Sequence, residues 1–290
     1  MSTSPLPSGS IRIFVAATTA EWLPARLLEF SIRERTSWPL ELRSIESFGR
    51  RIPRPAHKRN LARTPFSFQR FLIPELCAYR GRAIYLDADM QVFSDMADLW
   101  TMPMGNHDLL TVDGGALGRK GQFSVMLLNC ESLKWRIEDI VDGLDRQEYS
   151  YEELLHDMCL ARSVGRDIPA GWNSLEHHEP QATRLLHYTD MNAQPWVAVN
   201  NAFAHLWVAC LRRAVSAGFI TLSDIEREVK AGHVRPSLLA QIESKFDDPL
   251  ALPVNERRRL DRKFIAPYKC LDGHRWRRWA SWGRRLLTSR

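Results

Sequence analysis

Apolar runs and amphipathic segments alternate along roughly the first half of this chain. Segments that are continuously apolar or strictly alternating predict strands at 11–19, 40–47, 83–87 and 123–130. Apolar side chains at helical spacing predict helices at 21–36, at 64–81 and from about Ser132 onward. Strands and helices in this order are typical of an α/β domain with a mostly parallel sheet flanked by helices.

The strand predicted at 83–87 leads into two carboxylates. The sequence AIYLDADMQV places Asp87 and Asp89 at its end with Ala88 between them, and in a straight strand the two share a face. An unpartnered buried charge is expensive, so we expect both side chains at the strand's exit, facing a cation. Ligands of α/β sheets bind beyond the strands' carboxyl ends, and paired carboxylates suit Mg²⁺ or Mn²⁺. A pair of solvated loop aspartates is the alternative interpretation.

Haloacid-dehalogenase-type phosphohydrolases also place an Asp-x-Asp after an apolar strand. They carry Thr or Val two residues later, where this chain has Gln91. Their aspartate nucleophile lies near the start of the domain, whereas more than eighty residues precede this pair. A phosphohydrolase is therefore the second hypothesis.

The net charge of +6 is concentrated at the end of the chain. Residues 257–290 contain twelve Lys or Arg against two Asp, so the rest of the chain is slightly acidic. A nucleic-acid-binding face spread over the fold is not indicated, which also weakens a third hypothesis, a noncatalytic basic binding protein. The five cysteines are scattered without a CxxC pair, so neither a disulfide framework nor a zinc site is expected.

The beginning of the chain has no features of a targeting segment. Residues 1–10 are polar and rich in Pro and Ser, and predict a short disordered leader. No apolar run reaches the roughly 18 to 20 residues that span a bilayer. We therefore expect a cytoplasmic protein.

Five sequence blocks together resemble the family-8 glycosyltransferases. The central block, TPFSFQRFLIPELCAYRGRAIYLDADMQVFSDMADLW, carries the Asp-x-Asp pair. The other four, in chain order around it, are IRIFVAATTAEWLPARLLEFSIRE, QFSVMLLNCESLKW, GWNSLE and LLHYTDMNAQPW. A single motif would be weak, but five in the expected order over about residues 11–196 are strong.

The resemblance implies a GT-A fold, Rossmann-like, with a nucleotide-sugar-binding catalytic domain at 11–200 and a helical part at 201–256. It implies retaining transfer of a sugar, most simply a hexose, from a UDP-linked donor to a glycan or lipid-linked acceptor. It also implies a divalent cation, Mn²⁺ or else Mg²⁺, held by Asp87, Asp89 and His187. An imidazole ligand favours Mn²⁺ over Mg²⁺.

Other residues match family positions that contact the donor or the transferred sugar. Residues expected to bind the nucleotide-sugar are Ala16, Ala17, Thr18, Arg70, Ala88 and Gln194. Arg70 would bind the diphosphate or hold an aspartate. Residues expected near the reacting sugar, as catalytic candidates, are Gln122, Glu152 and Glu153. None is an unambiguous nucleophile, so an internal-return mechanism is expected.

The late motif departs from the family pattern. Asp190 stands where the family has a glycine, and Gln194 replaces a lysine that would neutralise the diphosphate. Candidates to replace that lysine are Arg70, Lys58 and other residues of the basic loop at 50–60.

The segment 257–290 forms a basic tail that contains Trp276, Trp279 and Trp282 at helical spacing among arginines. Such a helix suits an anionic membrane surface, here the inner face, because indoles bury apolar area and each basic residue adds about 1 kcal/mol. The alternative is a C-terminal helix whose tryptophans pack on the core. Nucleic acid is not an expected partner, because no binding fold accompanies the tail.

Truncation after Pro267 is predicted to abolish sedimentation with anionic liposomes while preserving hydrolysis of the donor. Salt should weaken liposome binding of the full chain as the Debye length falls from about 10 to 3 Å. A truncated protein that unfolds or loses donor hydrolysis would show that the tryptophans belong to the core.

Overall fold

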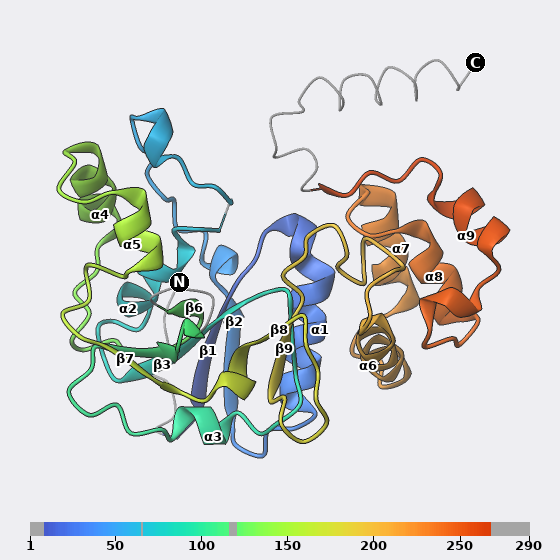
Figure 1. Ribbon diagram of the computed structural model, residues 1–290, viewed down its shortest axis with the longest axis horizontal. Coiled ribbons are helices and arrows are strands. Elements are labelled where there is room, and N and C mark those ends of the chain that lie inside the picture. Colours follow the sequence, from blue (N-terminus) through green and yellow to red (C-terminus); the bar gives the residue numbers. More distant parts are fainter. Residues whose placement is uncertain (1–8, 65, 116–120, 268–290) are drawn as a thin grey trace. The chain divides into compact units, whose positions relative to one another are not determined.

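The computed structural model describes residues 9–64, 66–115 and 121–267, in two compact units, Met1–His187 and Tyr188–Arg290 (Figure 1). The predicted leader, apart from its last two residues, and the three tryptophans of the tail lie outside the described residues. Each unit has its own core and is considered separately. No helix within the described ranges is long and apolar enough to cross a bilayer.

The first unit is built on a six-stranded sheet. Its strands are β1 (Ile11–Ala16), β2 (Leu40–Ser44), β3 (Arg82–Asp87), β5 (Leu109–Val112), β6 (Gln122–Asn129) and β7 (Val164–Ile168). Their spatial order is β2-β1-β3-β6-β5-β7. Of the neighbouring pairs, β1–β2, β1–β3 and β5–β7 are parallel, whereas β6 runs antiparallel to both β3 and β5. The expected mostly parallel α/β sheet is confirmed.

Both faces of the middle of this sheet are covered, which explains why its inner strands β1, β3, β5 and β6 are largely apolar, whereas the edge strands β2 and β7 carry charged residues. Helices on one side are α2 (Ile73–Leu76), α4 (Ile137–Asp145) and α5 (Tyr151–His156). They pack on alternate strand residues such as Phe14 and Tyr85. The other face, with Ile13 and Ile84, packs against α1 (Trp22–Arg33) (Figure 1). A short helix, α3 (Ala97–Trp100), adds Leu99 to the core on this face.

A second, three-stranded sheet joins distant parts of the chain. It consists of β4 (Met90–Val92), β9 (Leu185–His187) and β8 (Ser174–Leu175), in that order. The antiparallel register pairs Met90 with His187. Ser31 of α1 donates its hydroxyl to the carbonyl of Leu28 at 2.8 Å and accepts the Val92 N–H at 3.1 Å, so α1 fixes β4.

The helix predicted at 64–81 is much shorter than expected. The segment forms a 3-10 turn at Gln69–Leu72 and the single turn of α2, and residues 68–74 are buried without interruption. Because it is enclosed by the core, the segment is held by packing and need not be a long amphipathic helix. Ala78 and Tyr79 then adopt positive φ angles of 51° and 54°, which end the helix. The helix expected from Ser132 begins at Ile137, after the extended Arg136.

The second unit is helical, as the sequence predicts for residues beyond about 200. Its helices are α6 (Ala204–Ser216), α7 (Leu222–Ala231), α8 (Pro236–Glu243) and α9 (Val254–Asp261). Its core contains Trp196 against Trp207, with ring centroids 5.3 Å apart. A fully buried Arg235 donates to the Pro195 carbonyl, to Ser237 and to Gln241. Burial lowers the pKa of this guanidinium to about 10.

Substituting Gly171 by alanine is predicted to destabilise the first unit. A Cβ at Gly171 would lie 2.4 Å from the backbone oxygen of Ala182, which cannot swing away as a side chain could. We expect a loss of about 1–3 kcal/mol in the free energy of unfolding, as for other overpacked sites. Urea denaturation measures this, with Ala170→Ser at the exposed neighbouring position as the control. Equal stability of the two variants would contradict the close packing of this segment.

Candidate active site

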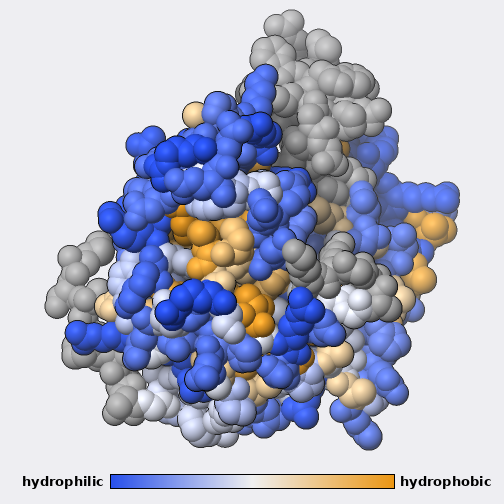
Figure 2. Space-filling view, turned by 60° about the vertical axis from the view of Figure 1, so that its left-hand side comes forward, coloured by the Kyte–Doolittle hydropathy of each residue, from blue (hydrophilic) through white to orange (hydrophobic). Residues whose placement is uncertain are grey.

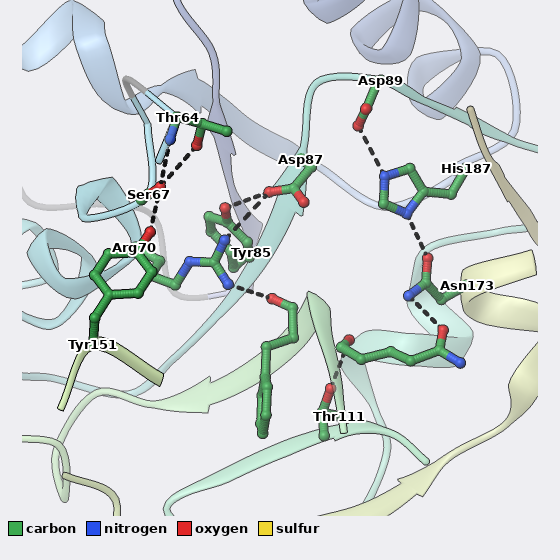
Figure 3. Close-up of polar contacts among 12 residues, drawn as sticks. Thr64, Ser67, Arg70, Tyr85, Asp87, Asp89, Thr111, Tyr151, Asn173 and His187 are labelled. Atoms are coloured by element: carbon green, nitrogen blue, oxygen red, sulfur yellow. Dashed lines mark hydrogen bonds and ion pairs between the residues drawn. The ribbon is translucent and has the colours of Figure 1, made fainter. Parts of the chain in front are cut away.

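Three potential metal ligands converge where β3 ends. Asp87 is the last residue of β3, Asp89 precedes β4, and the Met90–His187 pairing places His187 beside them. One ligand atom from each side chain lies within 4.8 Å of the others, and His187 Nε2 is 3.0 Å from Asp89 Oδ1 (Figure 3). The structure therefore brings together the three residues that the sequence predicts as metal ligands.

The other nitrogen of His187 is held by an amide. His187 Nδ1 lies 2.9 Å from Asn173 Oδ1, and Asn173 Nδ2 donates to Gln122 Oε1 at 2.8 Å (Figure 3). Gln122 Nε2 in turn donates to the Asp113 carbonyl at 3.2 Å. Because an amide oxygen can only accept, Nδ1 carries a proton and Nε2 is directed toward the carboxylates.

Asp87 is held from its other side by Tyr85 and Arg70. The Tyr85 hydroxyl donates to Asp87, and Arg70 Nη2 lies 3.8 Å from Asp87 Oδ1 (Figure 3). The guanidinium also donates to the Phe123 carbonyl at 3.0 Å and lies over the Tyr85 ring at 4.7 Å. Of the two roles predicted for Arg70, the structure shows it engaged in holding an aspartate.

The electrostatics of this cluster favour a cation. Burial raises the pKa of Asp87, and the nearby charge of Asp89 adds to the effect although Arg70 opposes it. Burial alone would lower the pKa of His187, but Asp89 and then Asp87 outweigh it and raise that pKa. Burial, reinforced by Asp89, raises the pKa of Glu21 to about 7. These carboxyls are too crowded for all of them to be charged without a compensating positive group.

The loop after β1 lies at the same edge of the sheet. Ala16 pairs with Asp87 in the parallel register of β1 and β3. The Ala17 carbonyl accepts from Gln69 Nε2 at 3.1 Å. Thr18 donates its N–H and its hydroxyl to Glu21 Oε2, at 2.9 and 3.1 Å. The predicted nucleotide-binding residues are thus adjacent to the acidic pair.

The structure gives three other predicted site residues different contacts. Glu153 caps helix α5 by accepting from the Ser150 N–H at 2.7 Å, and Glu152 forms an ion pair with Arg63. Gln194 belongs to the second unit, where its amide donates to the Tyr188 carbonyl at 2.9 Å. Catalysis by Glu152 or Glu153 and a donor contact by Gln194 stay predictions.

Sequence reasoning assigned no role to Asn173, Tyr85 or Glu21. Asn173 stands in the GWNSLE block, where a polar amide beside a buried tryptophan was the available signal. Tyr85 reads as an ordinary strand residue, and Glu21 as a helix-start carboxylate. Their relation to the acidic pair is visible only in three dimensions. Asn173 contacts His187, Tyr85 donates to Asp87, and Glu21 lies close enough to Asp89 for their charges to interact.

The donor set fits Mn²⁺ or a similar divalent ion. Two carboxylates and one neutral imidazole are borderline-hard ligands, and the edge of the sheet leaves further positions to a substrate. The proton on Nδ1 of His187 leaves Nε2 for a metal ion, as outer hydrogen bonds to metal-binding histidines commonly do.

Comparison with known proteins agrees with this geometry. Residues 36–139 match the family described as Glycosyl transferase family 8, which confirms the resemblance seen in the sequence. A relative named Protein CDI, from Arabidopsis thaliana, is 28% identical over 228 residues, or 68% of this chain and 84% of that protein.

Solved glycosyltransferase structures share the fold. The galactosyltransferase LgtC, solved with donor and acceptor sugar analogs, has a TM-score of 0.50 at 15% identity, covering 69% of this chain and 95% of LgtC. GlyE of Streptococcus pneumoniae TIGR4 has a TM-score of 0.51 at 16% identity, over 72% of this chain and 65% of GlyE. The bifunctional WbbM has a TM-score of 0.53 at 12% identity, over 72% of this chain, which spans half of WbbM. The predicted GT-A fold is confirmed.

Asn173→Ala is predicted to weaken metal binding by roughly 10- to 100-fold, the usual effect of losing the partner of a ligating histidine. The variant frees His187 to rotate and to change tautomer. Calorimetric titration with Mn²⁺ measures the affinity, and ¹⁵N NMR of the imidazole reports the tautomer. Asn60→Ala is the control, because it removes another buried amide, one bonded to the Leu144 carbonyl at 2.9 Å. Unchanged Mn²⁺ affinity in Asn173→Ala would show that the amide does not position the ligand.

Proposed function

Because residues 36–139 of this chain form part of a glycosyltransferase family 8 domain on a GT-A fold, we propose a metal-dependent, retaining glycosyltransferase. It moves a sugar, most simply a hexose, from a UDP-linked donor to a glycan or lipid-linked acceptor. The observation that carries the proposal is the convergence of Asp87, Asp89 and His187 beside the β1 loop.

Each group of residues has a distinct task in this proposal. Asp87, Asp89 and His187 hold Mn²⁺, with Mg²⁺ as the substitute. The bound ion supplies positive charge that stabilises the departing diphosphate. Arg70 and Tyr85 fix the Asp87 carboxylate, and Asn173 fixes the imidazole. The ligand side chains are thereby held in place before a metal ion binds, because they lie on or beside strands and are fixed by neighbouring residues.

The β1 loop is the proposed binding site for the nucleoside. Ala16 and Ala17 have small side chains, which allow a base and a ribose to approach the backbone. The Glu21 carboxylate holds Thr18 through two hydrogen bonds, so the loop's shape is set before the donor arrives. Ala88, between the two aspartates, is buried and offers backbone groups at the same edge.

Gln122 is linked to the ligand histidine through Asn173. Its link to Asn173 supports the proposed contact with the transferred sugar. Glu152 and Glu153 remain proposed catalytic carboxylates near the reacting sugar, although an ion pair and a helix cap engage them here. No side chain is an unambiguous nucleophile. Retention of the anomeric configuration is therefore proposed to follow an internal return, in which the departing phosphate accepts the proton of the acceptor hydroxyl.

The transferase is supported over its two rivals. The family match and the GT-A fold speak against a haloacid-dehalogenase-like phosphohydrolase and against a noncatalytic basic protein. A cytoplasmic site of action and docking of the 257–290 tail on an anionic inner membrane face are further proposals. They rest on the charge and tryptophan spacing of the sequence alone.

Asp89→Asn is predicted to reduce Mn²⁺-dependent binding of UDP at least about a hundredfold, because loss of a direct ligand exceeds the effect of an outer partner. Donor hydrolysis should fall with it, while the melting temperature stays close to that of the parent protein. Calorimetry with UDP, with and without Mn²⁺, separates the metal from the nucleotide. Asp139→Asn, an exposed aspartate on α4, is the matched control. Full activity of Asp89→Asn, or of the parent protein in EDTA, would refute the metal assignment.

A further inference from the structure

The segment between β2 and the turn that carries Arg70 is strongly cationic. From residue 47 to residue 74 the chain contains no Asp or Glu. The part at 50–63, hereafter the cationic loop, carries six basic side chains, Arg50, Arg51, Arg54, Lys58, Arg59 and Arg63. Apart from being candidates to replace the lysine missing at Gln194, they have no assigned role in the donor or metal site.

The backbone in the middle of the cationic loop is held against helix α4 mainly by Asp145. Asp145 accepts from the N–H groups of Ala56 and His57, at 2.8 and 3.4 Å, and from Asn60 Nδ2 at 3.2 Å. The Ala56 N–H is the largest cause that lowers the pKa of Asp145. Asn60 is buried and also bonds the Leu144 carbonyl. The loop backbone is therefore fixed beside α4 (Figure 1).

The basic side chains divide into two groups. Arg50 pairs with Glu75 and Glu138, at 3.3 and 2.7 Å, and Arg63 pairs with Glu152, so both ends of the loop are neutralised. The four between them, Arg51, Arg54, Lys58 and Arg59, are exposed, and the described part of the chain offers them no ion pair. Four uncompensated cations in nine residues create a local positive field on a domain that is otherwise slightly acidic.

The end of the cationic loop is joined to the candidate active site. The Arg63 N–H donates to the Tyr151 hydroxyl at 3.3 Å, and that hydroxyl donates to Ser67 Oγ at 3.1 Å. Three residues after Ser67, Arg70 contacts Asp87. Figure 3 shows Ser67 and Tyr151 next to the Arg70–Asp87 pair. The cationic loop is thus continuous with the segment whose Arg70 holds Asp87.

We propose that the cationic loop binds an acidic acceptor glycan, one that carries carboxylate, phosphate or sulfate groups. This assignment rests on the proposed transferase function, since it is the acceptor that must reach the edge of β3. The anionic groups pair with Arg51, Arg54, Lys58 and Arg59 while the sugar to be modified extends toward Asp87 and Asp89. Arginine suits this task because its planar guanidinium binds carboxylate, phosphate and sulfate oxygens in pairs.

A soluble acidic glycan fits the loop better than a bilayer or a nucleic acid does. Large hydrophobic side chains that would insert into lipid are not exposed here, since Ile52 and Leu61 are half-buried. The side brought forward in Figure 2 is predominantly hydrophilic, with a hydrophobic patch near its centre. The only regular structure in the loop is a 3-10 turn at Lys58–Asn60, which is too short to enter a nucleic-acid groove.

The test compares a loop variant with a control variant of equal charge. The loop variant replaces Arg51, Arg54, Lys58 and Arg59 by Gln. The control replaces four other exposed arginines of the same unit by Gln, namely Arg33, Arg43, Arg136 and Arg166. The probes are dextran sulfate, carboxymethyl dextran and neutral dextran of equal length, and binding is measured by interferometry at several salt concentrations.

We expect the parent protein to bind both acidic dextrans and not the neutral one, with an affinity that falls as salt rises. The loop variant should lose at least about tenfold in affinity, since each exposed ion contact contributes up to about fivefold. The control variant should lose less than about threefold. We expect equal binding of UDP with Mn²⁺ in all three proteins, measured in parallel. Weaker UDP binding by the loop variant alone would assign these residues to the donor diphosphate, in place of the lysine missing at Gln194, and would overturn the acceptor proposal. Loss of nucleotide binding by the parent protein itself would refute the proposed function instead.

Two further probes identify a wrong partner. Vesicles of phosphatidylglycerol with phosphatidylcholine, or a 20-base-pair DNA duplex, bound more tightly than the acidic dextrans through these four residues, would overturn the glycan assignment. Equal binding of the acidic dextrans by the loop variant and the parent protein would overturn it as well.

Discussion

The organising constraint in this protein is the burial of several acidic side chains and one histidine at the edge of a sheet. Asp87, Asp89, Glu21 and His187 are all largely removed from water, and their charges interact. Burying like charges together is unfavourable unless positive groups and hydrogen bonds compensate. Much of the surrounding structure supplies that compensation.

Two groups of residues compensate the buried charges, one charged and one neutral. On one side, Arg70 and Tyr85 contact Asp87, and their own positions are fixed by a carbonyl bond and a cation–π contact. On the other side, the neutral amides of Asn173 and Gln122 extend from His187 without adding charge. A charged clamp suits a ligand that must stay ionised. A neutral amide suits a histidine whose free nitrogen must remain able to bind a metal.

The same physical division separates the donor end of the molecule from the proposed acceptor surface. Near the strand edge, charges are buried, few and precisely bonded, which suits a compact donor and its ion. On the cationic loop, the four unpaired charges are exposed and close together, and Asp145 holds the backbone between them. Exposed charges attract over a distance and tolerate different partners, whereas buried ones select a single geometry. The ion pair of Arg63 with Glu152 marks the boundary between these two regions.

The sequence by itself determined four of the six strands of the large sheet, β1, β2, β3 and β6, their order along the chain and the acidic pair, because inner strands require largely apolar runs and Asp87 ends one of them. It also identified His187 by resemblance. It could not show that Arg70 is committed to Asp87, or that Asn173 and Glu21 belong to the site, because their partners are 17, 14 and 68 residues away. The tertiary structure decided the Asn173–His187 contact partly through the pairing of β4 with β9, which aligns residues 97 apart in the sequence, Met90 and His187. It decided the contacts of Arg70 and Glu21 by packing their segments against the end of β3. It also shortened the helix expected at 64–81, because enclosure on all sides, rather than periodicity, sets the conformation of a segment inside the core.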